Sequence, residues 1–430
     1  MSTVITEQAR PQERTDAILK PISWRWPVLY GVLTLAALLL FTLLPGLEGE
    51  TIYQLSRGSD LFKIPNLTVP AALTNWLLVA VMVALTILAF WLTRNRRDVP
   101  RWVPVVFGIA FVLTFLTYVG AGRSTVIPVT TLLSGALALS VPLVFGALCG
   151  VVCERSGIVN IAIEGQLLGG AFLAAVVGSL TSSAYLGMIA APIAGALVGV
   201  LLVFFAVRYW VDQIIVGVVL NVLVVGVTSF LFSTVLTEDK ATWNANQRLP
   251  ELPIPLLSEI PVIGPVLFRQ TLLVYIMYAA VILLQIFVFR SRWGLRMRAV
   301  GEHPKAADTV GIKVNRTRVI NTIFGGAIAG LGGAFFTVGS GLAFGKEMSA
   351  GQGYIALAAM ILGKWNPTGA VAAALLFGFS KNLGNVLSTI GSTVPSEFLL
   401  MLPYAVTIFA VAGLVGRVRA PAAENIPYIK

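Results

Sequence analysis

The chain has 430 residues, of which 57% are hydrophobic and only 11% are charged, and its mean hydropathy is +0.88. This composition excludes an ordinary soluble domain, because a water-facing surface requires a larger share of charged residues. The formal net charge of +11 is spread over loops without interleaved aromatic residues, so we predict no nucleic-acid partner.

Apolar stretches recur along the chain at about 20 residues, the length that a membrane-spanning helix needs. A single secretory signal peptide would not account for them. They predict an all-α polytopic membrane protein with about 10–12 transmembrane helices. The expected spans are Val28–Leu44, Ala71–Leu92, Val103–Tyr118, Ile127–Leu148, Gly165–Leu180, Tyr185–Val207, Ile214–Leu236, Leu272–Phe289, Val319–Val338, Tyr354–Leu362, Ala370–Leu387 and Phe398–Leu414.

Two of these spans are expected to be broken or partial helices. Tyr354–Leu362 is too short to cross a bilayer alone, and Ile127–Leu148 carries Pro128 and Pro142. Non-helical backbone at membrane depth is tolerated only where protein or water covers it. We therefore expect both spans to lie inside a bundle.

Four regions follow from the composition. Residues 1–26 are a polar cytoplasmic N-terminal segment, and residues 27–125 form an N-terminal transmembrane extension of about three helices. Residues 126–416 form a core whose spans are rich in Gly and Ala, and residues 417–430 are a cytoplasmic tail. Small residues let helix backbones approach closely, so the core should be a tightly packed bundle.

The placement of Lys and Arg predicts the orientation of the chain. Every second loop is the basic one, and the loop at residues 290–318 has eight Lys or Arg residues against Glu302 and Asp308. Basic residues favour the cytoplasmic side of short loops, so both termini are predicted to be cytoplasmic. Cys149 and Cys153 lie at the inner end of a span without a histidine nearby, which predicts packed thiols and not a disulfide or a metal site.

Two stretches share a design. Residues 157–166 and residues 351–356 each place amides or a carboxylate among glycines at a membrane boundary, and in the predicted topology they begin on opposite faces. An inverted-topology repeat has this arrangement, with unwound backbone lining a pathway. Glu164 is costly there unless it is hydrated, paired or capping, so a functional role and a helix cap stay open as alternatives. Lys381 should face the bundle interior or extend toward the interface.

The basic loop contains a predicted two-turn helix outside the membrane. Pro304 suits the first helical position and Gly311 the position just past the end. Such a helix presents Ala306 and Ala307 with Val310, and this knob could seat in a groove of a soluble partner. An ordinary amphipathic surface helix is the alternative.

Several sequence blocks indicate a family. Residues 153–165, CERSGIVNIAIEG, closely resemble the signature of permeases in the branched-chain amino acid and ribose ABC importer superfamily, and within it the nucleoside-importer branch served by basic-membrane-protein-type lipoprotein receptors. RAVGEHP at 298–304, GQGYIAL at 351–357, GKWNP at 363–367 and PYIK at 427–430 agree in the same order. The resemblance covers residues 127–430 and implies an ABC importer permease fold with inverted repeats and broken helices.

This resemblance implies a transmembrane permease subunit that moves nucleosides, or related small sugars, across the inner membrane of a bacterium. The implied partners are ABC ATPase subunits, a second homologous permease and an extracytoplasmic lipoprotein that delivers solute to outer loops such as Thr237–Gln270. No cofactor is expected on this chain, because ATP and Mg would bind the partner ATPase. The implied coupling helix, which docks on that ATPase, comprises Glu302, His303, Pro304, Lys305, Ala306, Ala307, Val310 and Gly311.

Polar side chains within apolar surroundings are candidates for the substrate pathway, because a nucleoside needs amide-type hydrogen bonds. We select Asn160, Glu164, Gln166, Asn221, Gln352 and Asn382.

ATP hydrolysis by this chain is not expected. The phosphate-loop motif is absent, since Gly345-Lys346 is followed by Glu347 and Gly363-Lys364 by Trp365. An ion-coupled secondary transporter of small polar solutes is the main alternative, and it would need a titratable group in the membrane, for which only Glu164 and Lys381 qualify. An enzyme acting on lipid-linked substrates would need catalytic clusters that the sequence lacks.

Overall fold

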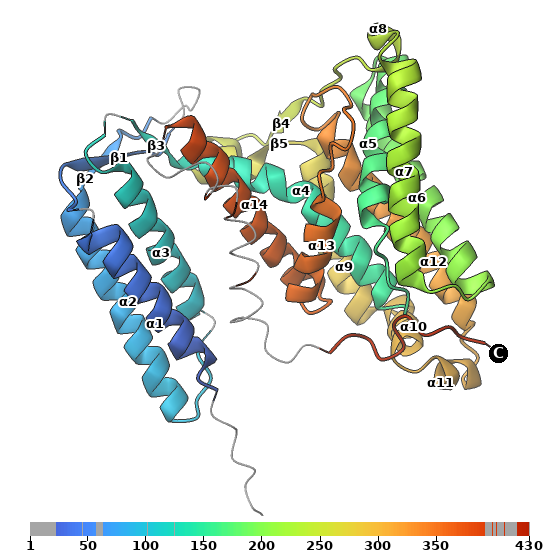
Figure 1. Cartoon of the computed structure of the whole chain (residues 1–430), viewed down its shortest axis with the longest axis horizontal. Helices are drawn as coiled ribbons and strands as arrows, with labels where there is room; N and C mark the ends of the chain where they lie inside the picture. Colours follow the sequence, from blue (N-terminus) through green and yellow to red (C-terminus); the bar gives the residue numbers. More distant parts are fainter. Residues whose placement is uncertain are drawn as a thin grey trace, which may run out of the picture. The chain divides into compact units, whose positions relative to one another are not determined.

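The computed structural model describes residues 23–44, 46–56, 63–100, 102–123, 125–391 and 419–429, together with residues 398, 401 and 408. The chain divides into two compact units, residues 1–48 with 70–118 and residues 49–69 with 119–430. Both are helical (Figure 1). The predicted N-terminal segment 1–26 lies largely outside the described residues, and so does the predicted last span 398–414.

The first unit is built from three apolar helices. They are α1 at Arg25–Leu38, which continues into the π-helical turn η1 at Leu39–Leu43, α2 at Ala71–Arg94 and α3 at Trp102–Gly120. Tyr30 of α1 stacks on Phe107 of α3 with ring centroids 4.3 Å apart, and the Asn75 amide of α2 donates to the Phe41 carbonyl at 2.8 Å. One buried core therefore joins all three helices.

The second unit contains the remaining elements. They are β1 Glu50–Gln54, β2 Leu67–Pro70, β3 Ile127–Pro128, α4 Val129–Glu154, α5 Ile163–Leu180, α6 Ala184–Val203, η2 Phe204–Arg208, α7 Gln213–Leu231, η3 Phe232–Leu236, α8 Lys240–Trp243, β4 Glu251–Pro253, η4 Leu257–Glu259, η5 Gly264–Phe268, β5 Arg269–Thr271, α9 Leu272–Arg290, α10 Arg292–Glu302, α11 Pro304–Thr309, α12 Val314–Gly333, η6 Ala334–Phe336, α13 Gln352–Leu362 and α14 Pro367–Thr389.

The polytopic membrane class is confirmed. Within the described residues ten helices are long and apolar enough to cross a membrane, and α13 is a shorter apolar helix. Strands are confined to short loop segments, where β1 pairs in parallel with β3 and β4 pairs antiparallel with β5. In a bilayer a helix satisfies its own backbone hydrogen bonds, which is why these apolar runs become helices.

The predicted break at Pro142 is wrong, because α4 runs without interruption from Val129 to Glu154. Pro128 occupies the position just before α4, where the helix needs no backbone N–H. Around Pro142 the helix is fully enclosed by α12, α13 and α14, and the Ser140 hydroxyl donates to the Leu137 carbonyl at 2.7 Å. Surrounding helices therefore hold α4 continuous despite the lost backbone donor.

Glycines set the closest helix contacts of the second unit. α12 packs along α6, and α5 packs along α6 and α12. A Cβ added at Gly195 of α6 would collide with the Gly326 carbonyl of α12, and one added at Gly170 of α5 would collide with the Gly330 carbonyl. The predicted tight packing is thus backbone against backbone, as small residues allow.

We expect Gly195→Ala to lower the stability of the folded protein by about 1–3 kcal/mol, because the added methyl group forces α6 away from α12. Thermal unfolding of the purified protein in detergent measures this change. Gly226→Ala is the matched control, since a Cβ at that α7 position meets no atom within 4 Å. Equal melting temperatures for the two variants would contradict the packing argument.

Candidate functional site

The centre of the candidate site is the start of the half-length helix α13. Turns and irregular backbone occupy residues 337–351, and α13 then runs for 11 residues, about 16 Å, roughly half of the hydrocarbon thickness. The span Tyr354–Leu362 is thus confirmed as too short to cross alone. Gly351, with φ of +77°, ends the turn, and Gln352 and Gly353 are buried. The N-terminus of α13 therefore opens inside the protein.

Glu164 closes that N-terminus. Its Oε1 accepts hydrogen bonds from the Ser349 hydroxyl at 2.6 Å and the Gly351 N–H at 2.8 Å, and its Oε2 accepts from the Gly353 N–H at 2.6 Å. A Cβ at Gly353 would lie 2.5 Å from the Glu164 Cα, so only glycine permits this approach. The carboxylate in the first turn of α5 thus caps α13, where it also meets the positive end of the helix dipole.

Asn221 of α7 ties the same region together. Its Oδ1 accepts from the Gly165 N–H at 2.8 Å, and its Nδ2 lies 2.9 Å from the Ile161 carbonyl and 3.1 Å from the Tyr354 hydroxyl. One amide therefore joins α7 to the start of α5 and to α13. No sequence pattern indicated Tyr354 as a polar partner of Asn221.

Asn160 and Gln166 form a second buried group with the two thiols. The Asn160 Nδ2 lies 3.0 Å from the Gln166 Oε1 and 3.1 Å from the Cys149 Sγ, and the Cys149 thiol donates to Gln166 at 3.3 Å. Cys149 and Cys153 are free and buried, with sulfur atoms 3.9 Å apart. The predicted packed thiols are confirmed, and they belong to the amide cluster.

Three buried amide atoms near the starts of α5 and α13 have no hydrogen-bond partner among the described residues. They are the Asn160 Oδ1, the Gln166 Nε2 and the Gln352 Oε1, and all three side chains are buried. Unpaired buried polar atoms cost free energy, so each is a position at which a polar solute or water would bind favourably. Five of the six candidate pathway residues therefore gather around the starts of α5 and α13.

Asn382 lies apart from this cluster. Its Nδ2 donates to the Leu132 carbonyl at 2.7 Å, which fastens α14 to the N-terminal half of α4, and Gly135 lies directly beneath the amide. Lys381, the next residue back on α14, is partly buried. The structure thus places five of the candidates together and Asn382 elsewhere.

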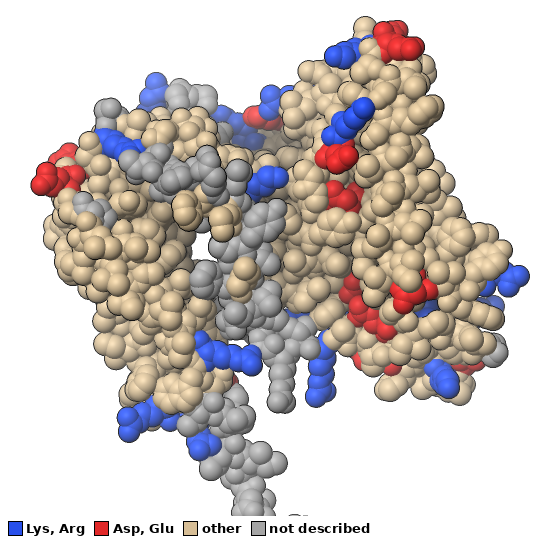
Figure 2. Space-filling view, viewed as in Figure 1, with Lys and Arg blue, Asp and Glu red and all other residues tan. Residues whose placement is uncertain are grey.

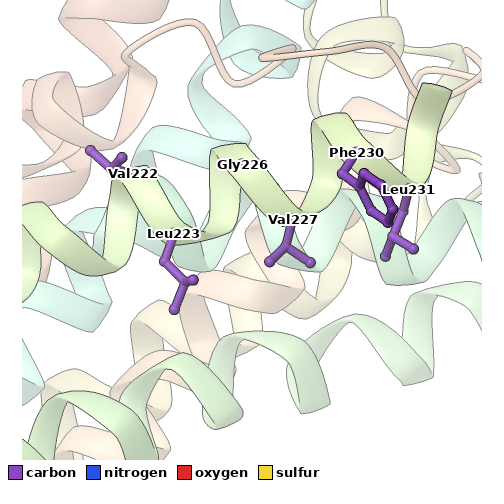
Figure 3. Close-up of a pocket in the computed structure, with 6 residues that line it drawn as sticks. All are labelled: Val222, Leu223, Gly226, Val227, Phe230 and Leu231. Atoms are coloured by element: carbon purple, nitrogen blue, oxygen red, sulfur yellow. The ribbon is translucent and has the colours of Figure 1, made fainter. Parts of the chain in front are cut away.

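The outward side of α7 is apolar and forms a shallow groove. Leu223, Val227 and Leu231 project from one side of the helix, and Gly226 lies without a side chain between Val222 and Phe230 (Figure 3). The lining contains only hydrocarbon side chains and a glycine. A polar solute would find no hydrogen-bond partner there, so this groove is not a candidate solute site.

The basic loop folds into two helices at one end of the second unit, opposite α8 (Figure 1). The predicted two-turn helix is confirmed as α11, with Pro304 at its first position and Gly311 at φ of +83° just past its end. Ala307 faces inward and packs with Val300 and Val314. Of the small residues expected to face a partner, Ala306 is exposed, and Val310 is 75% exposed beside it.

The C-terminal tail, residues 419–429, folds back onto this end. The Ala423 N–H donates to the Gly301 carbonyl at 2.8 Å, and the buried Arg318 guanidinium donates to the Ile426 carbonyl at 2.8 Å. The Asn425 side chain bonds to Asp212 at 3.1 Å. The tail therefore fixes α10, α12 and the start of α7 to one another, a role that its sequence did not reveal.

Two sequence blocks meet beside the tail. The Trp365 indole N–H donates to the Glu154 carboxylate at 2.5 Å, and the Arg155 Nε donates to the Trp365 carbonyl at 3.0 Å. The blocks at 153–155 and 363–367 are thus distant in sequence but adjacent in space.

In Figure 2, Lys and Arg side chains project around the α10–α11 end of this unit.

Burial raises the pKa of the Glu424 carboxyl, and a hydrogen bond with Glu154 offsets part of that rise. The Glu424 carboxyl therefore keeps its proton to a higher pH when the tail is docked than when the tail is free. Docking is strongest below the pKa of the free carboxyl, and it weakens as the pH rises from that value to the raised pKa of the docked carboxyl. Hydrogen exchange of residues 419–429 between about pH 4 and pH 8 should show this loss of protection.

Glu424→Gln, which stays neutral, should remove the pH dependence of tail protection. The control is Glu238→Gln, an exposed carboxyl in the loop after α7, which should leave the dependence intact. Identical pH profiles for the intact protein and Glu424→Gln would show that another group controls the tail.

A family model described as "Branched-chain amino acid transport system / permease component" matches residues 132–411, so the match begins after the first unit. No solved structure was found to match the chain.

Three curated relatives resemble the chain over most of their own length. The guanosine ABC transporter permease protein NupQ of Bacillus subtilis is 37% identical over 320 residues, 71% of this chain and 97% of that protein. The nucleoside ABC transporter permease protein NupC of Lactococcus lactis is 39% identical over 309 residues, 70% of this chain and 96% of that protein. NupB of Lactococcus lactis, also a nucleoside ABC transporter permease protein, is 22% identical over 322 residues, 73% and 85% of the two chains.

Proposed function

Because the chain belongs to the permease family of branched-chain amino acid transport systems, we propose that it is the membrane-spanning permease subunit of an ABC importer for nucleosides. The substrate class is proposed from the similarity to NupQ, which is named as a guanosine permease, and to NupC, which is named as a nucleoside permease. The alignment with this chain covers almost the whole length of both proteins. The ten apolar helices found in the described part of the chain agree with a multi-pass membrane protein.

Within that importer the α10–α11 end is the cytoplasmic end, because it carries the basic residues that favour the inner side of a membrane. Both termini are then cytoplasmic, and the membrane is the inner membrane of a bacterium. The exposed side of α11, with Ala306, Val310, Lys305, Glu302 and His303, is the surface that docks on a partner ATPase. Pro304 and Gly311 define the ends of this coupling helix, and Ala307 anchors it to the unit.

The other partners complete the assembly. A second homologous permease is supported by Lactococcus lactis, in which NupB and NupC are both named as nucleoside permease proteins and both resemble this chain. An extracytoplasmic lipoprotein binds the nucleoside and delivers it to the outer loops at residues 237–270. ATP and Mg bind the ATPase, and this chain itself is not an enzyme.

The solute pathway passes the starts of α5 and α13. Asn160, Gln166 and Gln352 provide the unpaired amide atoms, and Glu164 and Asn221 hold the backbone that surrounds them. Closure of the ATPases moves α11, and the tail transmits the movement to α10, α12 and α7. ATP binding thus shifts the population between two arrangements of one pathway. Asn382 holds α14 against the outer half of α4, where its amide donates to the Leu132 carbonyl.

Uptake of radiolabelled guanosine tests this function. Cells that lack other nucleoside uptake and express the complete importer should accumulate guanosine, and unlabelled adenosine should compete. Deletion of the ATPase subunit should abolish accumulation. Accumulation that survives this deletion but collapses with a protonophore at constant ATP would assign the chain to ion-coupled secondary transporters instead.

A further inference from the structure

A groove with a volume of about 740 Å³ lies between α10, the turn after α11 and the first turns of α12. Four of its lining residues are cationic and exposed, and we call them the groove cations: Arg292, Arg296, Lys313 and Arg316. None of the described residues that line the groove is acidic. Within the part of the chain that the structure describes, none of the groove cations forms an ion pair.

Four like charges that line one groove repel one another, and an anion bound between them offsets this repulsion. Guanidinium groups bind phosphate oxygens with paired N–H donors, which makes a phosphate group a suitable occupant. The groove therefore has the electrostatics of an anion site.

Asn321, a buried residue that lines the groove, adds a second requirement. Asn321 is fully buried, and its Nδ2 donates to the Thr317 carbonyl at 2.8 Å. Its Oδ1 has no partner among the described residues, although Asn321 lines the groove. An oxygen of this kind accepts a hydrogen bond, so the occupant should carry a hydroxyl or ammonium donor beside its anionic group.

The apolar side of the groove continues along the membrane-spanning part of α12. Ile320, which lines the groove, is 48% exposed, and Phe324 one turn further is 44% exposed. Trp293 lines the groove and meets Phe324 edge to face, with ring centroids 6.0 Å apart. Tryptophan at a helix end marks the level of lipid headgroups, with the acyl region beyond it.

We infer that this groove binds one anionic phospholipid, with the phosphodiester between the groove cations, a headgroup hydroxyl on the Asn321 Oδ1 and an acyl chain along Ile320 and Phe324. Basic pockets between helices at the cytoplasmic face are suited to such headgroups. Val310 and Gly311 also line the groove, so the bound headgroup touches the end of α11. That this lipid contacts a coupling helix rests on the function proposed above, whereas lipid binding itself does not.

The continuous apolar wall favours lipid over an acidic surface of the ATPase. A soluble protein would meet the exposed cations but would have no access to Ile320 and Phe324, which lie within the predicted span. A phospholipid presents charge and hydrocarbon in the same order as the groove does.

Native mass spectrometry of the purified complete importer, titrated with defined lipids, measures this binding. Phosphatidylglycerol should bind at least about tenfold more tightly than phosphatidylcholine. Phosphatidylmethanol, which has the phosphodiester but no headgroup hydroxyl, should bind about fivefold more weakly than phosphatidylglycerol, the equivalent of one hydrogen bond. Equal binding of phosphatidylcholine and phosphatidylglycerol by the intact protein would overturn the inference without any variant.

Arg296→Gln combined with Arg316→Gln should raise the dissociation constant for phosphatidylglycerol about 30-fold. The matched control is Arg94→Gln combined with Arg208→Gln, two exposed arginines at helix ends outside the groove, which should leave it unchanged. Equal weakening by both pairs would mean diffuse attraction and no site. If the variant with Arg296→Gln and Arg316→Gln lost the ATPase but bound lipid as before, the groove would be a protein docking site. If millimolar inorganic phosphate displaced the lipid from the intact protein, the groove would be a phosphate site.

Discussion

Replacing Glu164 by alanine is expected to lower the stability of the protein by about 3–5 kcal/mol. The carboxylate accepts three hydrogen bonds, two of them from backbone N–H groups at the N-terminus of α13. Alanine would leave these buried donors unpaired, and each unpaired donor costs about 1–3 kcal/mol. Because α13 starts inside the bundle, water cannot readily replace the carboxylate.

Chemical or thermal unfolding of the detergent-purified protein measures this loss. Glu164→Gln keeps one acceptor but places an amide donor against N–H groups, so it should fall between alanine and the intact protein. The control is Glu347→Ala, an exposed carboxylate in the same irregular segment, which should change stability by less than about 0.5 kcal/mol. If Glu164→Ala were as stable as this control but transported nothing, the carboxylate would act on the solute or an ion and not on α13.

Combining Ala306→Asp with Val310→Asp is expected to weaken association with the ATPase by about 100-fold or more. Both side chains are exposed on α11, and Val310 is 75% exposed, so the substitutions leave the fold of this chain intact. Burying an unpaired carboxylate in an interface costs about 3–5 kcal/mol, which corresponds to this loss of affinity. Guanosine uptake should fall with the association.

Co-purification of the ATPase with the tagged permease measures the effect. Leu256→Asp, 80% exposed in the loop between β4 and β5 at the other end of the unit, makes the same chemical change and should retain the ATPase. Ala307→Asp should fail for a different reason, because Ala307 is buried against Val300 and Val314 and the charge would unfold α11. Normal ATPase recovery with Ala306→Asp and Val310→Asp together would place the docking surface elsewhere.

Local sequence signals predicted the features that depend on a few neighbouring residues. Apolar runs predicted the spans, the length of Tyr354–Leu362 predicted a partial helix, and Pro304 with Gly311 predicted both ends of α11. These signals are local because the bilayer and the backbone impose them on any chain.

The features that the sequence did not predict depend on contacts across long sequence separations. Glu164 bonds to residues 185–189 positions away, and Arg318 bonds to the tail more than 100 positions away. Pro142 was expected to break its helix, but α4 is continuous through it and is enclosed by other helices. The inward side of Ala307 likewise depends on Val300 and Val314, which flank α11 in the fold.

Transport in proteoliposomes distinguishes ATP-driven import from ion-coupled transport. The complete importer, reconstituted with the nucleoside-loaded lipoprotein outside and ATP inside, is predicted to accumulate guanosine in the lumen. A non-hydrolysable ATP analogue should stop accumulation, and a protonophore should have no effect. Accumulation that needs an ion gradient and proceeds without ATP would exclude an ABC importer, because this chain would then move its solute without the ATPase that α11 is proposed to engage.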